Sequence, residues 1–222
     1  EGMFIPKTSD GRVLFCLPWH GMLEVGTTDL PEPVPVNMDP KISDQEIDFM
    51  MANCNNYLKT KVTREDILAT FVGVRPLYTP ANASASGAKV SREHAIIPEF
   101  GNMLTITGGK WTAYRNMAEH AMKVAAEKGL IPSSHTITTK LPLTVDTAFD
   151  AEAIEMRAAQ AEKVEDVVDD VVAFAIREVQ VSGARNADDV LFRRLRLGQM
   201  NSKRTEELRG PVQAAIDKEL KK

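Results

Sequence analysis

The most constraining feature of the sequence is an abrupt change from a strand pattern to a helix pattern within residues 103–129. The run Met103-Leu104-Thr105-Ile106-Thr107 predicts a strand, and Gly108-Gly109-Lys110 follows it without a linker. Apolar residues then recur at helical spacing as far as Ala125, and Gly129 stands where a helix would end. A chain organised around such a unit contains both sheet and helix, so we expect an α+β fold.

Strand patterns are concentrated before residue 110, whereas only helical patterns follow residue 150. The predicted strands cover 13–17, 22–26, 71–74 and a hairpin at 96–97 and 103–107 that turns at 99–102. Ser43 and Glu46 form a capping-box pattern that predicts a helix start, and a second short helix is predicted over 64–70. We therefore predict a mixed β-sheet with flanking helices over 1–135, and an all-α domain over 145–222.

The predicted helical domain has an uneven distribution of charge. Its candidate helices cover 151–163, 164–179, 188–197 and 202–221. Acidic side chains outnumber basic ones over 151–189, and the reverse holds over 190–222, which would let the two halves face each other. A solvated charged surface is the alternative. The basic, amphipathic run 190–197 suits contact with a membrane surface, with packing into a helix bundle as the alternative.

Composition excludes several classes of protein. Of the 222 residues, 43% are hydrophobic and 26% are charged, which is typical of a globular chain rather than a disordered one. The net charge of −4 argues against a dedicated nucleic-acid binder. Cys16 and Cys54 have no metal-binding or redox spacing and are too few for a disulfide scaffold, and no histidines have metal-ligand spacing. We therefore predict a reducing compartment, the cytoplasm, and no metal site.

The N-terminal sequence contains no secretory signal pattern, and no apolar run approaches the roughly 20 residues that span a bilayer. The chain begins without methionine and close to a predicted strand. We expect it to be a piece of a longer protein.

The Gly108-Gly109-Lys110 turn is a candidate anion site. Glycines allow a ligand to approach the backbone closely, and the first N–H groups of the following helix are free to bind an anion. The helix dipole favours negative charge there, and Lys110 adds a positive charge. A phosphate, or the pyrimidine edge of a reduced flavin, would fit such a site. An ordinary tight connection with Lys110 in solvent is the alternative.

Two arginines and a histidine lie near predicted strand ends. Arg75 precedes a proline, which favours an extended backbone, and its guanidinium offers paired donors to a phosphate or carboxylate. Arg92 stands just before the predicted hairpin and could offer the same paired donors. Structural ion pairs are the alternative for both arginines. His94, two residues after Arg92, is a candidate acid or base, with an ordinary surface histidine as the alternative. Arg75, Arg92 and Lys110 would form a small-anion pocket if the fold brings them together.

Five segments, taken in order, resemble the FAD-dependent glycerol-3-phosphate dehydrogenases. They are Lys7-Thr8-Ser9-Asp10-Gly11-Arg12-Val13-Leu14-Phe15, Pro18-Trp19 with Gly26-Thr27-Thr28-Asp29, Gly73-Val74-Arg75-Pro76-Leu77, Ser91-Arg92-Glu93-His94, and Thr105-Ile106-Thr107-Gly108-Gly109-Lys110-Trp111-Thr112-Ala113-Tyr114-Arg115. The resemblance extends over about 1–130 and is weaker over 164–200. It implies a flavoprotein that oxidises sn-glycerol 3-phosphate to dihydroxyacetone phosphate by hydride transfer to FAD.

The resemblance also implies roles for individual residues. Arg75, Arg92 and Lys110 would contact the substrate, and the turn of Gly108, Gly109, Lys110, Trp111 and Thr112 would hold the flavin ring. Lys110, Arg92 and His94 are the candidate catalytic residues, and which of them handles the hydroxyl proton stays open. Electrons would pass to a quinone at a membrane surface or to electron-accepting subunits, which makes a peripheral position on the cytoplasmic membrane the second location that we consider.

One family feature is missing from the sequence. The Gly-x-Gly-x-x-Gly fingerprint that holds the FAD pyrophosphate occurs nowhere in it. We therefore expect the chain to be the C-terminal part of the enzyme, to bind FAD poorly alone and to be inactive alone. A glycerol-3-phosphate oxidase is the nearest alternative. A non-catalytic module that binds a small phosphorylated metabolite, and a purely structural helical interaction domain, are alternatives from other classes.

Overall fold

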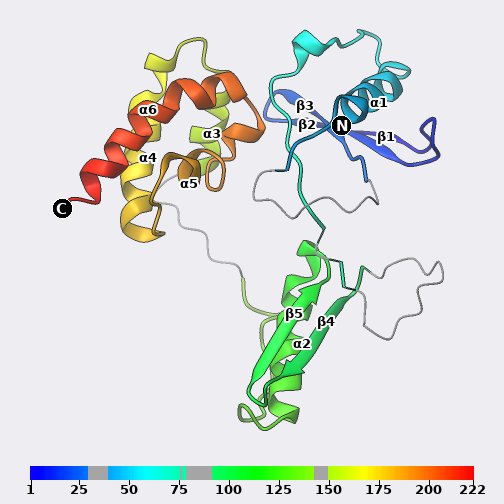
Figure 1. Cartoon of the computed structure of the whole chain (residues 1–222), viewed down its shortest axis with the longest axis vertical. Helices are drawn as coiled ribbons and strands as arrows, with labels where there is room; N and C mark the ends of the chain where they lie inside the picture. The colour runs from blue at the N-terminus through cyan, green and yellow to red at the C-terminus, as the bar shows by residue number, and fades with distance from the viewer. Residues whose placement is uncertain (30–39, 76, 79–91, 143–149) are drawn as a thin grey trace. The chain divides into compact units, whose positions relative to one another are not determined.

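The computed structural model describes residues 1–29, 40–75, 77–78, 92–142 and 150–222 (Figure 1). Contacts divide the chain into a first unit, Glu1–Val72 with Asp146–Lys222, and a second unit, Gly73–Val145. The predicted α+β class is confirmed, with the strands in two separate antiparallel sheets and helices around them. These two units have other boundaries than the predicted domains, 1–135 and 145–222. The division into those domains stays a prediction for the longer protein.

The first unit begins with a three-stranded sheet. Strands β1 (Met3–Ile5), β2 (Leu14–Trp19) and β3 (Met22–Gly26) pair in sequence order, and all pairs are antiparallel. Helix α1 (Asp44–Asn55) contacts this sheet, and its predicted capping box is confirmed: the Ser43 side chain accepts from the Glu46 N–H while the Glu46 carboxylate accepts from the Ser43 N–H. The core between them consists of Ile5, Leu14, Cys16 and Cys54.

The helical part of the first unit matches three of the four predicted helices, whereas the fourth, predicted over 188–197, ends at Leu191, where turns follow. It consists of α3 (Ala151–Gln160), α4 (Val168–Val181), α5 (Ala187–Leu191) and α6 (Ser202–Glu219). Helices α4 and α6 lie side by side (Figure 1), and fully buried Val171, Leu208 and Ile216 are part of the core that these helices share. Leu191 and Leu195 are also fully buried, so the apolar side of the 190–197 run packs into this bundle.

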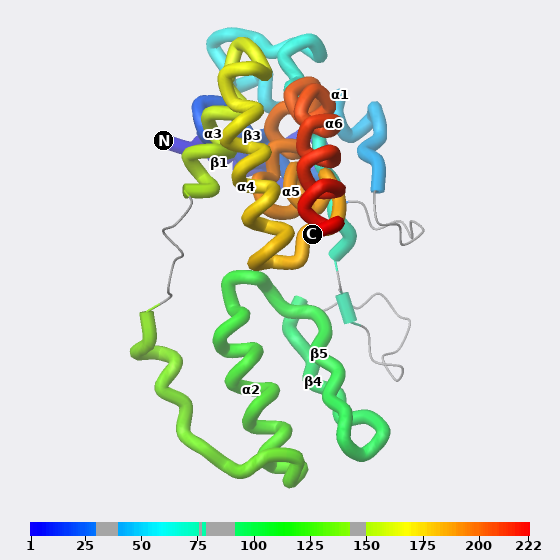
Figure 2. Tube along the Cα trace, turned by 90° about the vertical axis from the view of Figure 1, so that its left-hand side faces the viewer, coloured from blue at the N-terminus to red at the C-terminus, as the bar shows by residue number. Residues whose placement is uncertain are grey.

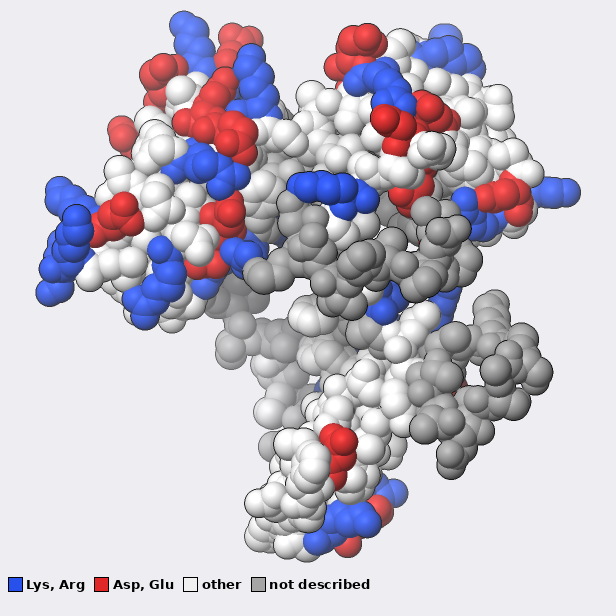
Figure 3. Space-filling view, viewed as in Figure 1, with Lys and Arg blue, Asp and Glu red and all other residues white. Residues whose placement is uncertain are grey.

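Ion pairs join the acidic and the basic halves of this bundle. Glu155 pairs with Arg196 at 2.9 Å, Glu178 pairs with Arg194 at 3.2 Å, and Asp188 pairs with Arg209. The prediction that the two halves face each other is thus confirmed at these three pairs. Elsewhere on the visible face, Figure 3 shows acidic and basic side chains intermixed over the helices.

Two predictions for residues 64–74 are wrong. Only Arg64–Asp66 is helical, as a 3₁₀ turn, instead of a helix over 64–70. Phe71, Val72 and Val74 form no strand and are exposed. The physical reason is the absence of a neighbour: a strand needs an adjacent strand for its backbone N–H and C=O groups, and the described residues supply none here.

Glu155 is the most deeply buried carboxylate among the described residues, at 1% exposed. Burial raises the pKa of its carboxyl above the usual range, and the hydrogen bond from Arg196 offsets only part of that effect. One carboxylate oxygen, Oε1, has no hydrogen-bond partner among the described residues. Because the folded state holds this proton more tightly than the unfolded state, ionisation of Glu155 lowers the free energy of unfolding as the pH rises.

We predict that Glu155→Gln stabilises the chain relative to the natural sequence increasingly as the pH rises from about 4 to about 7. Glutamine keeps an oxygen that accepts from Arg196 but cannot ionise. The measurement is urea unfolding followed by circular dichroism across this pH range, with the difference between the two proteins taken at each pH. A difference that is constant, or that falls with pH, would contradict the prediction.

The second unit is a hairpin packed on one helix. Strands β4 (His94–Glu99) and β5 (Met103–Gly108) are antiparallel, which confirms the predicted hairpin. A 3₁₀ turn (Trp111–Ala113) leads into α2 (Tyr114–Glu127), and α2 lies against the hairpin in both Figures 1 and 2. Gly129, at φ 71°, ends the helix as predicted, because its N–H donates to the Ala126 carbonyl while the Leu130 N–H donates to that of Ala125.

None of the helices in the described residues combines the length and the apolar character needed to cross a bilayer.

Candidate functional site

The candidate site lies where β5 ends and the helical segment begins. His94, the first residue of β4, pairs in register with Gly108, the last residue of β5. Gly108 and Gly109 have φ values of 71° and 83°, which turn the chain out of the sheet within two residues. The Lys110 carbonyl then accepts from the Ala113 N–H at 2.9 Å and begins the helical segment. The structure therefore confirms the predicted strand–glycine–helix arrangement.

Packing against backbone requires a glycine at position 108, whereas at position 109 the nearest neighbour is the flexible end of a side chain and the positive φ is the stronger reason for glycine. A Cβ on Gly108 would lie 2.6 Å from the Glu93 carbonyl oxygen, and one on Gly109 would lie 2.7 Å from Met117 Sδ. His94 Cβ would be a further neighbour, 3.0 Å from a Cβ on Gly109. The backbone of the turn is thus backed closely by β4 and α2. These contacts, with the positive φ at Gly109, explain the glycines without a ligand, whereas the sequence analysis explained them by the close approach of a ligand to the backbone.

The other side of the turn is open. Lys110 is exposed, and Trp111 is 90% exposed, with its ring 6.3 Å from that of Tyr114. Thr112, the fifth residue predicted to contact a flavin, is also exposed. The N–H groups at the start of the helical segment therefore adjoin a charged lysine and an uncovered aromatic ring. This side of the turn combines an electropositive helix end with a flat apolar surface.

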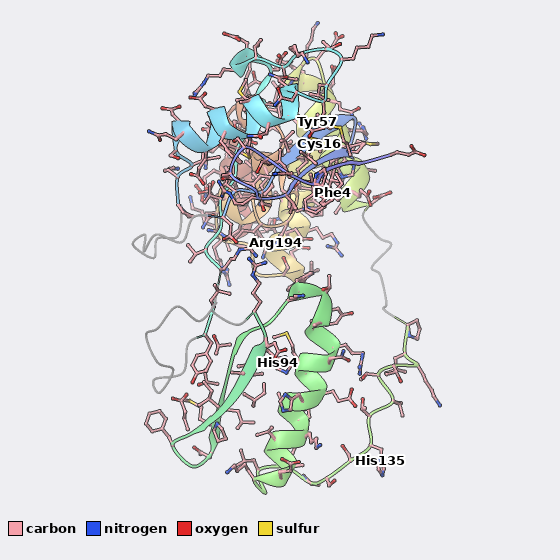
Figure 4. The ribbon with its side chains drawn as sticks, turned by 90° about the vertical axis from the view of Figure 1, so that its right-hand side faces the viewer. Phe4, Cys16, Tyr57, His94, His135 and Arg194 are labelled. Carbon is pink, nitrogen blue, oxygen red and sulfur yellow. The ribbon has the colours of Figure 1, made fainter. Side chains whose placement is uncertain are left out.

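His94 is hydrogen-bonded to a second histidine that the sequence analysis did not select. His94 Nε2 lies 2.8 Å from His120 Nδ1, and the two rings meet edge to face. Figure 4 shows His94 beside the hairpin and α2. One ring must donate and the other accept, so the bond needs at least one neutral imidazole. Sequence spacing gives no signal for this pair because it depends on how α2 packs on β4.

The two arginines of the predicted anion pocket differ in how closely the fold ties them to the turn. Arg92 is exposed and lies two residues before His94, where β4 begins. Arg75 is exposed in an irregular segment near the start of the second unit. The structure thus brings His94 and the glycine turn together and puts Arg92 at the same end of the hairpin. Convergence of Arg75 with them stays a prediction.

The cofactor implied by the resemblance fits these residues in part. The open side of the turn offers donors, a cation and an aromatic surface, which suit the pyrimidine edge of a flavin ring. A pyrophosphate site of the dinucleotide-binding kind needs a glycine fingerprint after a parallel strand. The sequence lacks the fingerprint, and the strand pairs of the described residues are all antiparallel. The fit therefore extends to one edge of the flavin and not to the whole cofactor.

The first two segments of the resemblance form a tight structure at the start of the first unit. The Thr8 N–H donates to the Arg12 carbonyl at 2.9 Å, and the Ser9 N–H donates to Asn53 Oδ1 of α1 at 2.9 Å. Arg12 also donates to the Asp10 carboxylate, which lowers the pKa of Asp10 to about 2. Among the described residues, Thr28 follows β3 and donates to the Glu46 carboxylate at 2.6 Å. These motif residues join the sheet to α1.

In the part of the chain that the structure describes, no group of three His, Cys, Asp or Glu side chains lies close enough together to hold a metal ion.

Comparison with known proteins finds relatives that share one name. No family model matches the chain. The chain is 41% identical to a mitochondrial glycerol-3-phosphate dehydrogenase of Arabidopsis thaliana over 143 residues. The aligned residues cover 64% of this chain and 22% of that protein. It is 42% identical over 128 residues to the human mitochondrial enzyme of the same name, covering 57% of this chain and 17% of that protein.

A third relative, the mitochondrial glycerol-3-phosphate dehydrogenase of Saccharomyces cerevisiae, is 40% identical over 136 residues, which is 58% of this chain and 21% of that protein. The chain thus spans about a fifth of the length of the curated relatives that it matches. The resemblance seen in the sequence motifs is confirmed, and the chain is a homologue of one segment of the glycerol-3-phosphate dehydrogenases.

Proposed function

We propose that this chain is a segment of an FAD-dependent glycerol-3-phosphate dehydrogenase and that it supplies the residues facing the substrate and one edge of the flavin. The names of the relatives and the order of the five motifs support this proposal. The observation that carries it is the arrangement of the second unit. There, Lys110 and the start of the helical segment follow the glycine turn, and His94 pairs with Gly108 on the neighbouring strand.

Each candidate residue has a distinct role in this proposal. Bound FAD would accept a hydride from C2 of sn-glycerol 3-phosphate. Lys110 and the N–H groups of the helical segment would stabilise the negative charge that develops at the flavin's pyrimidine edge. Arg75 and Arg92 would bind the substrate phosphate through paired N–H donors.

His94 is the residue that we favour as acceptor of the C2 hydroxyl proton. Its Nε2 bonds to His120, which leaves Nδ1 for the substrate. As Nδ1 takes the hydroxyl proton, Nε2–H passes its own proton to His120 Nδ1, and His120 releases one from Nε2 to solvent. His120 is exposed, so this last transfer is open to water. Lys110 and Arg92 carry positive charge in their usual states and are weaker candidates for a base.

The test of the proposal is an assay of the full-length flavoprotein encoded by the reading frame that contains this chain. We expect reduction of a quinone analogue that depends on glycerol 3-phosphate, with dihydroxyacetone phosphate as product. Stoichiometric hydrogen peroxide in the absence of a quinone would favour the glycerol-3-phosphate oxidase instead. Failure to oxidise glycerol 3-phosphate with any acceptor, in a protein with bound FAD, would overturn both readings.

We predict that the chain alone binds FAD more weakly than micromolar, because its sequence lacks the glycine fingerprint and the described residues form no parallel strand pair for a pyrophosphate site. Titration of FAD followed by flavin fluorescence measures this directly. Calorimetry with glycerol 3-phosphate, without FAD, is the companion measurement. Tight binding of glycerol 3-phosphate alone would favour the metabolite-binding module, and micromolar binding of FAD would contradict the prediction.

Quinone reduction at a membrane surface, and transfer to electron-accepting subunits, belong to the same proposal for the whole protein. The three relatives are named as mitochondrial proteins. The cytoplasmic or peripheral membrane location expected from the sequence stays a proposal here. Fractionation of cells with and without a high-salt wash of the membranes distinguishes a cytoplasmic from a peripherally bound protein.

A further inference from the structure

Two cysteines that are far apart in the sequence meet in the core of the first unit. Cys16 lies on β2 and Cys54 lies in the last turn of α1, and their Sγ atoms are 3.3 Å apart. Both are free thiols, and each is 1% exposed (Cys16 is labelled in Figure 4). We propose that Cys16 and Cys54 are a redox modification site, at which a reversible disulfide joins the sheet to α1.

The geometry needs only a small adjustment. A disulfide holds its sulfur atoms about 2.05 Å apart, so the two Sγ atoms must approach by about 1.3 Å. The elements that carry them are already packed: Cys16 is paired in the sheet with Met3 on one side and Val25 on the other. Asn53, beside Cys54, accepts from the Ser9 N–H at 2.9 Å and so holds the end of α1 near the connection between β1 and β2.

The oxidant in this proposal is a small disulfide such as oxidised glutathione. The thiolate of one cysteine attacks the small disulfide, which forms a mixed disulfide and releases one thiolate. The second cysteine then attacks the protein sulfur of the mixed disulfide, forms the Cys16–Cys54 bond and releases the other thiolate. Two protein thiols are oxidised, and one small disulfide is reduced to two thiols.

Burial determines how fast this exchange occurs. Removal from water, together with the hydrogen bond to Cys54, raises the pKa of the Cys16 thiol to about 12. The thiolate is the attacking species, so little of it is present near neutral pH. We expect slow oxidation of the folded chain, faster oxidation at higher pH, and further acceleration by mild urea, which opens the contact between α1 and the sheet.

The test uses the full chain and oxidised glutathione, with free thiols blocked by N-ethylmaleimide after unfolding. Trypsin cleaves after Arg12, Lys41 and Lys59, so each cysteine has its own peptide, 13–41 and 42–59. We expect a monomer with no free thiol and with these two peptides joined by a disulfide. The cross-linked chain should also melt at a higher temperature than the reduced one, since the cross-link restricts the unfolded chain.

Cys16→Ser and Cys54→Ser are matched controls, and each should yield only a mixed disulfide or a dimer on the remaining cysteine. Their circular dichroism spectra establish that they fold. Recovery of both thiols with glutathione attached, or of disulfide-linked dimers only, from the natural sequence would overturn the proposal. No step of this test depends on dehydrogenase activity, so its outcome is independent of the proposed function.

Discussion

Lys110→Met, made in the full-length flavoprotein, is expected to lower kcat with glycerol 3-phosphate by about 100-fold, the scale of losing one preorganised charge-stabilising donor. Methionine keeps most of the length of the side chain and removes its charge. Lys110 is exposed and its side chain makes no cap hydrogen bond, so the fold should be unaffected. The measurement is steady-state kinetics with a quinone analogue, together with the flavin absorbance spectrum to establish that cofactor is bound.

Lys123→Met is the matched control for this experiment. Lys123 is an exposed lysine of α2 whose ammonium lies 3.9 Å from the Glu127 carboxylate, and it is not part of the turn. We expect its kcat to stay within about twofold of the natural protein, since surface substitutions of this kind have small effects. Equal losses in the two variants, or no loss in Lys110→Met, would remove Lys110 from the proposed mechanism.

The second large effect is expected at Gly108. Gly108→Ala places a Cβ 2.6 Å from a backbone carbonyl oxygen, which cannot rotate away, and adds the strain of an alanine at φ 71°. The positive φ alone costs roughly 1–2 kcal/mol. The contact with the Glu93 carbonyl must in addition displace the end of β4, where His94 begins the strand. We therefore expect amide hydrogen exchange along β4 and β5 to accelerate strongly in this variant.

Gly101→Ala isolates the contribution of backbone strain. Gly101 has φ 79°, in the turn between β4 and β5, and a Cβ there would meet no atom within 4 Å. Its variant should lose only the conformational cost, so its hydrogen exchange should rise much less than that of Gly108→Ala. If both variants exchange alike, the close approach of β4 to Gly108 does not contribute to stability, and the packing reason for that glycine is wrong.

Sequence reasoning succeeded where the determining interactions are local. The β4–β5 hairpin, the glycine turn and the end of α2 at Gly129 depend on residues close together in the chain, and each was predicted. The capping box at Ser43 is local in the same sense, because its hydrogen bonds connect residues three apart. The helices after residue 150 were found because their apolar spacing has a helical period.

Sequence reasoning failed where distant segments determine the result. The 71–74 run has a strand-like composition, but strand formation depends on a neighbour that lies elsewhere in the sequence. Cys16 and Cys54 are 38 positions apart and show no redox spacing, yet their sulfur atoms are in contact. His120 was passed over for the same reason: its bond to His94 depends on the packing of a helix on a strand. For Arg75 and Arg92, convergence with Lys110 stays a prediction.

The two units differ in how far along the chain their contacts reach, and this sets an order for folding during synthesis. The hairpin, turn and α2 are complete once residues 92–130 have left the ribosome, and short contacts of this kind form quickly. The first unit needs partners from both ends of the chain: the Ser202 N–H donates to the Leu68 carbonyl at 3.0 Å, and Gln160 donates to the His20 carbonyl. Translation therefore completes the sheet with α1 first, since their shared core lies within residues 3–58, and the segment with the candidate site next. The helices after residue 150 join the first unit last.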